Sequence, residues 1–265
     1  MTDTQWNIRQ PLLAVGQGTS SLALLLAQPG QLPGQWIRAV LPATGSPEIQ
    51  INRFSQENGI ACPHAVIIAN SGATGLQSPG LSGAERMRFW QDELKHTGGQ
   101  PEDSIKTACN KLISCDECYL ADLASAFALA ALSVDELRNR SWNEGVTAIW
   151  AGSVHTLALL IFREKICAVY EHKADYPASG VSDHIRQLQL SWLPDEHIRQ
   201  TGGNGCVIGE MPPEAEGFKP AWILGPNHKN FATLGRFRSV CADDCYTLCF
   251  GLIYGYLKKS GSSNI

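Results

Sequence analysis

Two short runs of glycine and hydroxyl residues, each lying between apolar segments, are the strongest candidates for chemistry in this sequence. Their members are Gly16, Gly18, Thr19 and Ser20 in the first run, and Gly152, Ser153, His155 and Thr156 in the second. Glycine leaves backbone N–H groups unobstructed, and these groups together with Ser and Thr hydroxyls can hold a phosphate. Either run alone also fits an ordinary hairpin turn. Their occurrence in both halves of the chain favours two turns that clasp the phosphates of one nucleotide.

A third glycine loop follows a predicted helix at residues 201–205. Gly202, Gly203 and Gly205 would let a flat group such as adenosine lie against the backbone. The same glycines are typical of a helix C-cap followed by a turn. Both interpretations stay open at this point.

Ionisable residues near these loops are the candidates for acid–base work. Glu171 and His172 end a predicted strand, where Glu171 could hold a metal-bound water and His172 could act as an acid, a base or a phosphate donor. Asp243 precedes the predicted C-terminal helix and could either face the chemistry or cap that helix. A solvated strand end is the alternative for Glu171 and His172. We take these three residues as candidate catalytic residues, and we predict no metal-ligand set of protein side chains.

The elements that must position these residues are repeated within the chain. Residues 22–26 (LALLL) match residues 157–161 (LALLI) at an offset of 135 positions. In each half this segment follows a glycine-containing turn and precedes a third apolar run, at residues 36–41 and 166–170. A shared place within each half indicates duplication. Each half therefore is predicted to open with a three-stranded meander.

The remaining segments alternate between helix and strand patterns. The predicted helices cover residues 46–57, 82–96, 120–132, 194–200 and 243–258, with one more capped by Ser182; the predicted strands include residues 64–69 and 222–224. This alternation is typical of an α/β fold. We predict a first lobe at residues 1–135 and a second lobe at residues 136–265.

Composition excludes several classes of function. The 265-residue chain has 21 basic and 25 acidic residues, a formal net charge of −4, and 44% hydrophobic residues. Nucleic-acid binding is not expected, because it needs clustered Lys and Arg. The longest apolar stretches, at residues 22–27 and 157–162, are far shorter than a membrane span. The first residues lack an export signal, so a cytoplasmic location is expected.

The nine cysteines are expected to be reduced thiols, because their number is odd and no secretion signal precedes them. Cys115 and Cys118 have the spacing of a redox or zinc motif, but no second pair follows. Cys241, Cys245 and Cys249 recur every four residues, which would place them on one face of a helix. We favour the interpretation that these cysteines are small apolar residues packed against a core. A metal or iron–sulfur site is the alternative.

The two glycine hairpins and the late glycine loop resemble the phosphate-1, phosphate-2 and adenosine elements of the superfamily of actin, 70-kDa heat-shock proteins and sugar kinases. More narrowly, the chain is similar to an uncharacterised prokaryotic family of this superfamily, catalogued as a pyruvate formate-lyase activating enzyme. The narrower likeness rests on residues 152–158, 170–172, 202–205 and 249–252, together with Gly225, Pro226 and Asp243.

The resemblance implies a two-lobed, actin-like ATPase fold of the ribonuclease H-like kind, with a duplicated β-meander and helices in each lobe. It implies ATP with Mg²⁺ as the ligand. The activity implied is that of a phosphotransferase or an ATPase; the alternative is a degenerate ligand-binding accessory or regulatory subunit.

The sequence departs from the superfamily where carboxylates are expected. Ala14 and Ala151 stand where the superfamily places aspartates in the first strands of the two lobes, and Ser21 replaces a further acidic residue. Phosphoryl transfer depends on metal and water positioning, so these changes favour ligand binding over turnover. A radical activase is rejected, because its three-cysteine cluster motif is missing from the sequence.

Overall fold

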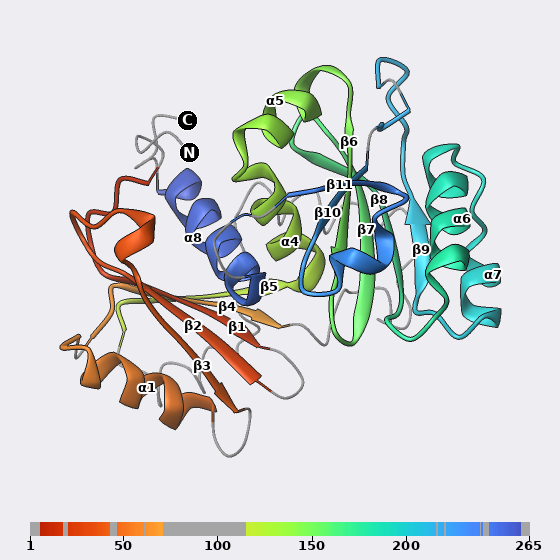
Figure 1. Ribbon diagram of the computed structural model, residues 1–265. Coiled ribbons are helices and arrows are strands. Elements are labelled where there is room, and N and C mark those ends of the chain that lie inside the picture. Colours follow the sequence, from red (N-terminus) through yellow and green to blue (C-terminus); the bar gives the residue numbers. More distant parts are fainter. Residues whose placement is uncertain are drawn as a thin grey trace.

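Two β-sheets, each flanked by helices, form the framework of the protein (Figure 1). The computed structural model describes residues 6–17, 21–42, 47–60, 62–70, 115–215, 217–219, 221–238, 240 and 244–260. In Figure 1 the first sheet lies on the left and the second on the right, with two helices between them.

The first sheet begins with an antiparallel meander and continues with two parallel strands. Its spatial order is β3 (Ile37–Pro42), β2 (Ser21–Ala27), β1 (Leu12–Gln17), β4 (Ala65–Asn70) and β5 (Glu117–Asp122). The strands β1, β2 and β3 pair antiparallel in sequence order, while β4 pairs parallel with β1 and β5 pairs parallel with β4. Continuous apolar runs such as LLAV in β1 suit strands that are covered on both faces.

The second sheet repeats this arrangement. Its order is β11 (Gly235–Phe237), β10 (Ala221–Leu224), β6 (Val146–Ala151), β7 (His155–Phe162), β8 (Lys165–Lys173) and β9 (Gly205–Ile208). The meander β6–β7–β8 is antiparallel, and β10 and β11 continue from β6 in parallel. The strand β9 is an addition, paired antiparallel with β8. The predicted fold class, an α/β protein with a duplicated meander, is confirmed.

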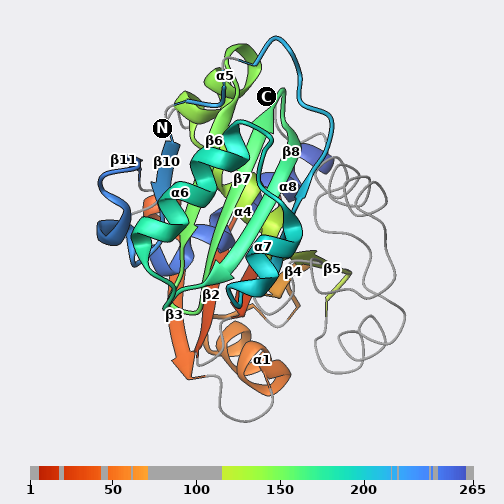
Figure 2. The ribbon, with the colours of Figure 1, turned by 90° about the vertical axis from the view of Figure 1, so that its right-hand side faces the viewer.

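Helices cover the outer faces of the two sheets. Helix α1 (Pro47–Glu57) packs on the first sheet through Ile51 and Phe54. Helices α6 (Ala178–Gln189) and α7 (Asp195–Gln200) lie across the strands of the second sheet (Figure 2). The burial of one apolar stripe from each helix is the main force that holds these layers together.

Two helices fill the space between the sheets. Helix α4 (Leu123–Leu132) contacts β6 and β7 of the second sheet, whereas the C-terminal helix α8 (Thr247–Lys259) contacts β1 and β4 of the first. One apolar cluster therefore extends from sheet to sheet. A short helix, α5 (Asp135–Asn143), links α4 to the second sheet. The division of the chain at residue 135 stays a prediction.

Small residues bring α4 and α8 into close contact. A Cβ atom at Gly251 of α8 would lie 2.5 Å from the backbone nitrogen of Ala130 and would also meet the Ala126 carbonyl oxygen. The alanine-rich sequence of α4 therefore has a packing role, because it lets the two backbones approach.

Several predicted boundaries are wrong in detail. Residues 120–122 belong to β5, so α4 starts only at Leu123. Ser182 does not cap its helix, since α6 begins at Ala178 and the Ser182 hydroxyl donates to the Ala178 carbonyl within it. Sequence reasoning missed β9, β11 and α5 altogether. The predicted helix at residues 82–96 lies outside the described residues.

The cysteine pattern is also partly wrong. Cys245 lies in a 3-10 turn, Asp244–Tyr246, before α8 and is exposed, whereas Cys249 lies within α8 and is buried. These two residues therefore share no helix face, and Cys241 lies outside the described residues. Cys249 packs against the first sheet, where its thiol donates to the Ala23 carbonyl oxygen over 3.4 Å. For Cys249, the interpretation as a small core residue is confirmed.

Among the described residues, no helix combines the length and apolar character needed to cross a membrane.

Candidate functional site

The turn between β6 and β7 is shaped by Gly152. Its N–H donates to the His155 carbonyl oxygen over 3.1 Å, which leaves Ser153 and Val154 at the tip. A Cβ atom at position 152 would lie 2.6 Å from Trp150 Nε1 and 2.7 Å from the His155 oxygen. Only glycine fits at this position without displacing its neighbours.

A loop after β10 braces this turn from the side. Asn227 donates from its backbone N–H to the Ala151 oxygen over 2.9 Å and from its side-chain amide to the Gly152 oxygen over 2.7 Å. Gly225 has a φ of +101°, which favours glycine, and brings the loop close to Ala151. Sequence reasoning missed Asn227, although the Gly225–Pro226 dipeptide marks a turn at that point.

The tip of the turn presents backbone donors to solvent. Ser153 and Val154 are exposed, and within the described residues the N–H groups of both lack an acceptor. Unpaired, exposed N–H groups in a turn form an anion-binding concavity. Thr156, by contrast, is 1% exposed and lies within the strand β7. Of the four residues predicted in this run, Thr156 is thus buried away from the tip.

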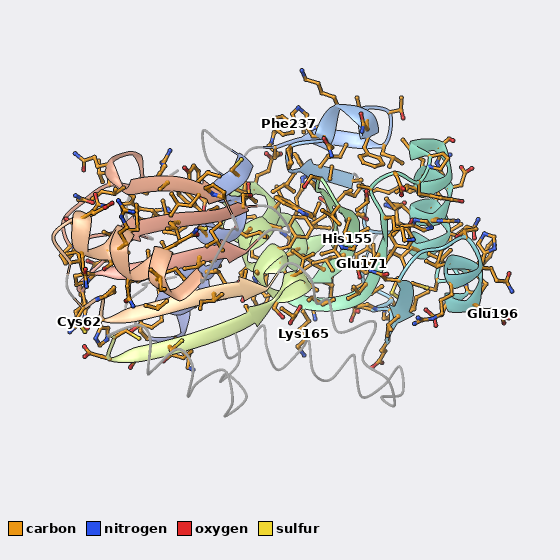
Figure 3. All side chains as sticks on the ribbon, turned by 90° about the horizontal axis from the view of Figure 1, so that it is seen from below. Cys62, His155, Lys165, Glu171, Glu196 and Phe237 are labelled. Atoms are coloured by element: carbon orange, nitrogen blue, oxygen red, sulfur yellow. The ribbon has the colours of Figure 1, made fainter. Side chains whose placement is uncertain are left out.

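His155 and Glu171 come together at this hairpin. The Nδ1 atom of His155 lies 3.2 Å from Glu171 Oε1, and the two side chains are 21% and 3% exposed. Both residues lie on the face of the second sheet that is turned toward α4 and the first lobe, as do Leu157 and Val169. Figure 3 shows the two side chains beside one another near the middle of the molecule. Sequence analysis singled out each residue but not their pairing.

His172 points to the opposite face of the same strand. The strand β8 runs on to Lys173, one residue beyond the predicted end at Glu171 and His172, and successive side chains alternate between faces. His172 is 1% exposed; its Nε2 lies 3.2 Å from Thr201 Oγ1, and its ring stacks on Tyr176 at 3.9 Å. The structure therefore separates Glu171 from His172.

A cluster of aromatic and histidine side chains surrounds His172 beneath α6. Tyr170 and His184 share a hydrogen bond of 3.1 Å between the phenol oxygen and Nδ1, and His184 stacks on Tyr176. Burial lowers the pKa of His172. Burial also lowers the pKa of His184, and nearby His197 and His172 add to that effect. Burial raises the pKa of the Tyr170 phenol. We call Tyr170, His172, Tyr176 and His184 the outer cluster.

The glycine loop at residues 201–205 ends helix α7. Gly202 has a φ of +85° and donates to the Arg199 carbonyl, while Gly203 donates to the Ile198 carbonyl. These two bonds form a Schellman C-cap, so the C-cap interpretation is confirmed. A Cβ at Gly203 would lie 2.5 Å from His172 Cδ2, which ties the loop to the outer cluster.

The same loop runs back along β8. The Asn204 N–H donates to the Glu171 carbonyl oxygen over 3.1 Å, and Gly205 pairs with Glu171 in the sheet. Gly205 has a φ of +124°, and a side chain there would collide with Asp195. The adenosine contact of Gly202, Gly203 and Gly205 stays a prediction.

In the first hairpin, Gly16 is the one predicted site residue within the described ranges. Gly16 is buried in β1, whereas Gly18, Thr19 and Ser20 lie outside the described residues, as does Asp243. Ala14 is fully buried in the apolar cluster between the sheets.

The interior-facing residue at the end of β6 is Trp150, whose ring lies 5.8 Å from that of Phe127 in α4. Ala151 faces the outer apolar cluster instead. An aspartate at position 151 would therefore not point toward the first lobe.

Asp122, at the end of β5, is a further described carboxylate. It caps α4, with Oδ1 accepting from the Ser125 N–H over 3.0 Å and Oδ2 accepting from the Ser125 hydroxyl over 2.7 Å. Both oxygens therefore take part in the helix cap.

A sequence model of one family matches residues 84–230, more than half of the chain. The protein belongs to this family, whose description reads "Putative pyruvate format-lyase activating enzyme (DUF1786)". None of the curated proteins matches the sequence.

Solved structures of similar overall shape are distant in sequence. The MreB5 protein of Spiroplasma citri bound to ADP is 11% identical, with 96% of this chain and 99% of that chain covered and a TM-score of 0.49. The ethanolamine utilization protein EutJ from Carboxydothermus hydrogenoformans is 12% identical, with coverages of 91% and 88% and a TM-score of 0.46. The activator of the 2-hydroxyisocaproyl-CoA dehydratase from Clostridium difficile with bound ADPNP is 9% identical, with coverages of 96% and 98% and a TM-score of 0.47.

Proposed function

We propose that this protein binds a nucleotide between its two lobes, with the β6–β7 turn at the phosphates. The observation that carries this proposal is the turn itself: Gly152 admits no side chain, and the N–H groups of Ser153 and Val154 are exposed and lack an acceptor in the described part of the chain. The absence of a side chain at Gly152 and the two exposed N–H groups of Ser153 and Val154 together support anion binding without any charged side chain.

The other predicted contacts complete the proposed site. Gly16, Gly18, Thr19 and Ser20 would approach the phosphates from the first lobe, and Gly202, Gly203 and Gly205 would lie near the adenosine. ATP is the proposed nucleotide.

The described residues fit the phosphates better than they fit Mg²⁺. A hydrated Mg²⁺ ion is usually held by one or two carboxylates. The described interior-facing positions at the ends of β1 and β6 carry Gly16 and Trp150 instead. Asp122 caps a helix, and Glu171 pairs with His155. We therefore derive no step through the metal.

A catalytically degenerate, ligand-binding protein is the version we favour. The buried Ala14 and the outward-facing Ala151 leave those two strands without metal-holding carboxylates. Phosphotransferase or ATPase activity is the second candidate. In that case Glu171 and Asp243 would be nearest the chemistry, because His172 lies on the other face of the sheet.

The activity in the family's description is not proposed for this chain. Glycyl-radical activation needs a cluster held by three cysteines. In the described ranges, no group of three cysteine, histidine or carboxylate side chains is placed to hold a metal.

Thermal-shift measurements with ATP and ADP, each with Mg²⁺ and with EDTA, test the proposal. We expect both nucleotides to raise the melting temperature of the wild type. The variant Gly152→Ala should lose this shift, while Gly34→Ala should keep it, since a Cβ at position 34 meets nothing within 4 Å. The absence of a shift with either nucleotide in the wild type would exclude nucleotide binding. Release of phosphate from ATP would favour the enzymatic version.

A further inference from the structure

Glu171 is unusual because it is a buried carboxylate that faces the junction of the lobes. Its side chain is 3% exposed, while in the described part of the chain every other ion pair has side chains at least 18% exposed. Burying a carboxylate is costly unless a partner compensates its charge. One partner of Glu171 is His155, at 3.2 Å.

His155 is placed between this carboxylate and the turn. Its Nδ1 atom lies 3.2 Å from Glu171 Oε1 as an ion-pair contact without hydrogen-bond geometry, and in the described ranges its Nε2 atom has no hydrogen bond. The ring is partly exposed and directly follows the exposed tip at Ser153 and Val154. A carboxylate beside one imidazole nitrogen orients the ring, which leaves the other nitrogen for a ligand.

We propose, on the basis of the nucleotide site above, that His155 binds the phosphate of the ligand, that Glu171 positions it, and that this contact needs no divalent cation. The imidazole N–H and the two backbone N–H groups at the tip would supply the donors. Hydrogen bonds to an ionised phosphate are charge-assisted and roughly twice as strong as neutral ones. The pair thus takes the place that a carboxylate-held metal ion has at other phosphate sites.

Few charged side chains lie on the described elements next to His155. Glu171 lies on β8, and Lys173 stands opposite His155 in the register of β7 and β8. Neither β9 nor the loop at residues 225–227 carries a charged residue. Helix α4 likewise has none, and Asp122 at its start is engaged with Ser125.

Calorimetric titration with ADP, in Mg²⁺ and in EDTA, tests this inference. Wild-type affinity should be nearly the same in Mg²⁺ and in EDTA. His155→Phe should lower the affinity about tenfold or more, which corresponds to the loss of a charge-assisted hydrogen bond. The matched control Lys165→Gln, an exposed change at the other end of β8, should leave the affinity unchanged.

The variant Glu171→Gln tests whether Glu171 acts by positioning His155. It should lower the affinity for ADP in the wild-type background but not in the His155→Phe background, because it acts through the histidine. A purely structural role for Glu171 would lower the affinity equally in both backgrounds, which would contradict the proposal.

The outcomes distinguish this inference from the nucleotide proposal. Binding of ADP that disappears in EDTA, or that is unchanged in His155→Phe, overturns the role of His155 and leaves nucleotide binding intact. No binding of ADP by the wild type in either buffer overturns nucleotide binding itself. If His155→Phe does not fold, the histidine Cε1–H resonances of the wild type decide the matter: a shift of the His155 signal on ADP addition in EDTA is expected, and its absence contradicts the inference.

Discussion

The two copies of the meander have the same strand order but differ in what they bury. In the first copy, β1 and β2 contribute Leu, Val and Ala to the clusters on both faces of the sheet. In the second copy, β7 and β8 also bury Thr156, Glu171 and His172. Because the frame is the same, the difference lies in side chains at the strand ends. The two copies share one architecture, and β8 of the second copy carries the buried Glu171 and His172, which have no ionisable counterpart in β1 and β2.

Among the changes predicted here, a carboxylate introduced into the first copy of the meander should lower the free energy of unfolding the most. Ala14→Asp would place an uncompensated charge at a fully buried position, which typically costs about 3–5 kcal/mol. We expect a correspondingly lower urea midpoint and no gain of phosphate release. Val40→Asp, at a residue 46% exposed on β3, is the control and should change the midpoint little. A stable Ala14→Asp protein whose midpoint rises with Mg²⁺ would show that the first copy retains a metal position.

Gly152→Ala should have the next largest effect, in the turn of the second copy. Its Cβ would lie within 2.7 Å of both Trp150 Nε1 and the His155 oxygen, so the turn must open at a cost of about 1–3 kcal/mol. Chemical denaturation measures this cost, and ADP titration should show weakened binding. Unchanged stability would mean that the turn can relax, and the contrast between the two hairpins would then be smaller than we infer.

The outer cluster should make the second lobe sensitive to acid. The pKa values of His172 and His184 are lowered, chiefly by burial, so the folded state binds fewer protons than the unfolded chain. Stability should therefore be fully present above the ordinary histidine pKa of about 6.5 and should be lost as the pH falls through and below it.

Hydrogen exchange at pH 8 and at pH 5 checks this prediction. At pH 5, protection should decrease in α6 and α7 before it decreases in the first sheet. His172→Phe, which keeps a ring against Tyr176, should show a smaller decrease. Equal loss of protection in both sheets would show that the cluster does not control the acid response.

The arrangement of the strands could be predicted from the sequence because it follows from apolar runs and from their repetition. The offset between residues 22–26 and 157–161 reflects the real equivalence of β2 and β7. By contrast, β11 has only three residues, one half-buried and two exposed, which leaves no pattern to detect. The boundary between β5 and α4 was missed because small apolar residues continue across it, although Asp122 and Ser125 have the spacing of a helix cap.

The site was harder to predict than the frame. The opposite orientation of Glu171 and His172 follows from strand alternation once β8 is known to continue to Lys173. The pairing of His155 with Glu171 depends on the register of β7 against β8, and neither residue type nor spacing specifies that register. Asn227 contacts Gly152, which lies 75 positions away in the sequence, so no local sequence pattern predicts this contact.

Gly16→Ala should have the smallest effect and is the direct counterpart of Gly152→Ala. A Cβ at position 16 would lie 3.4 Å from Cys249 Sγ and 3.7 Å from the Ala23 Cβ, which are ordinary packing distances. Because glycine within a strand costs roughly 0.5–1 kcal/mol relative to alanine, the variant should be neutral or slightly more stable, as measured by its urea midpoint. Its response to ADP should match that of the wild type. If a well-folded Gly16→Ala protein instead loses the response to ADP, the ligand approaches both hairpins equally closely, and the chemistry is shared between the two copies rather than concentrated in the second.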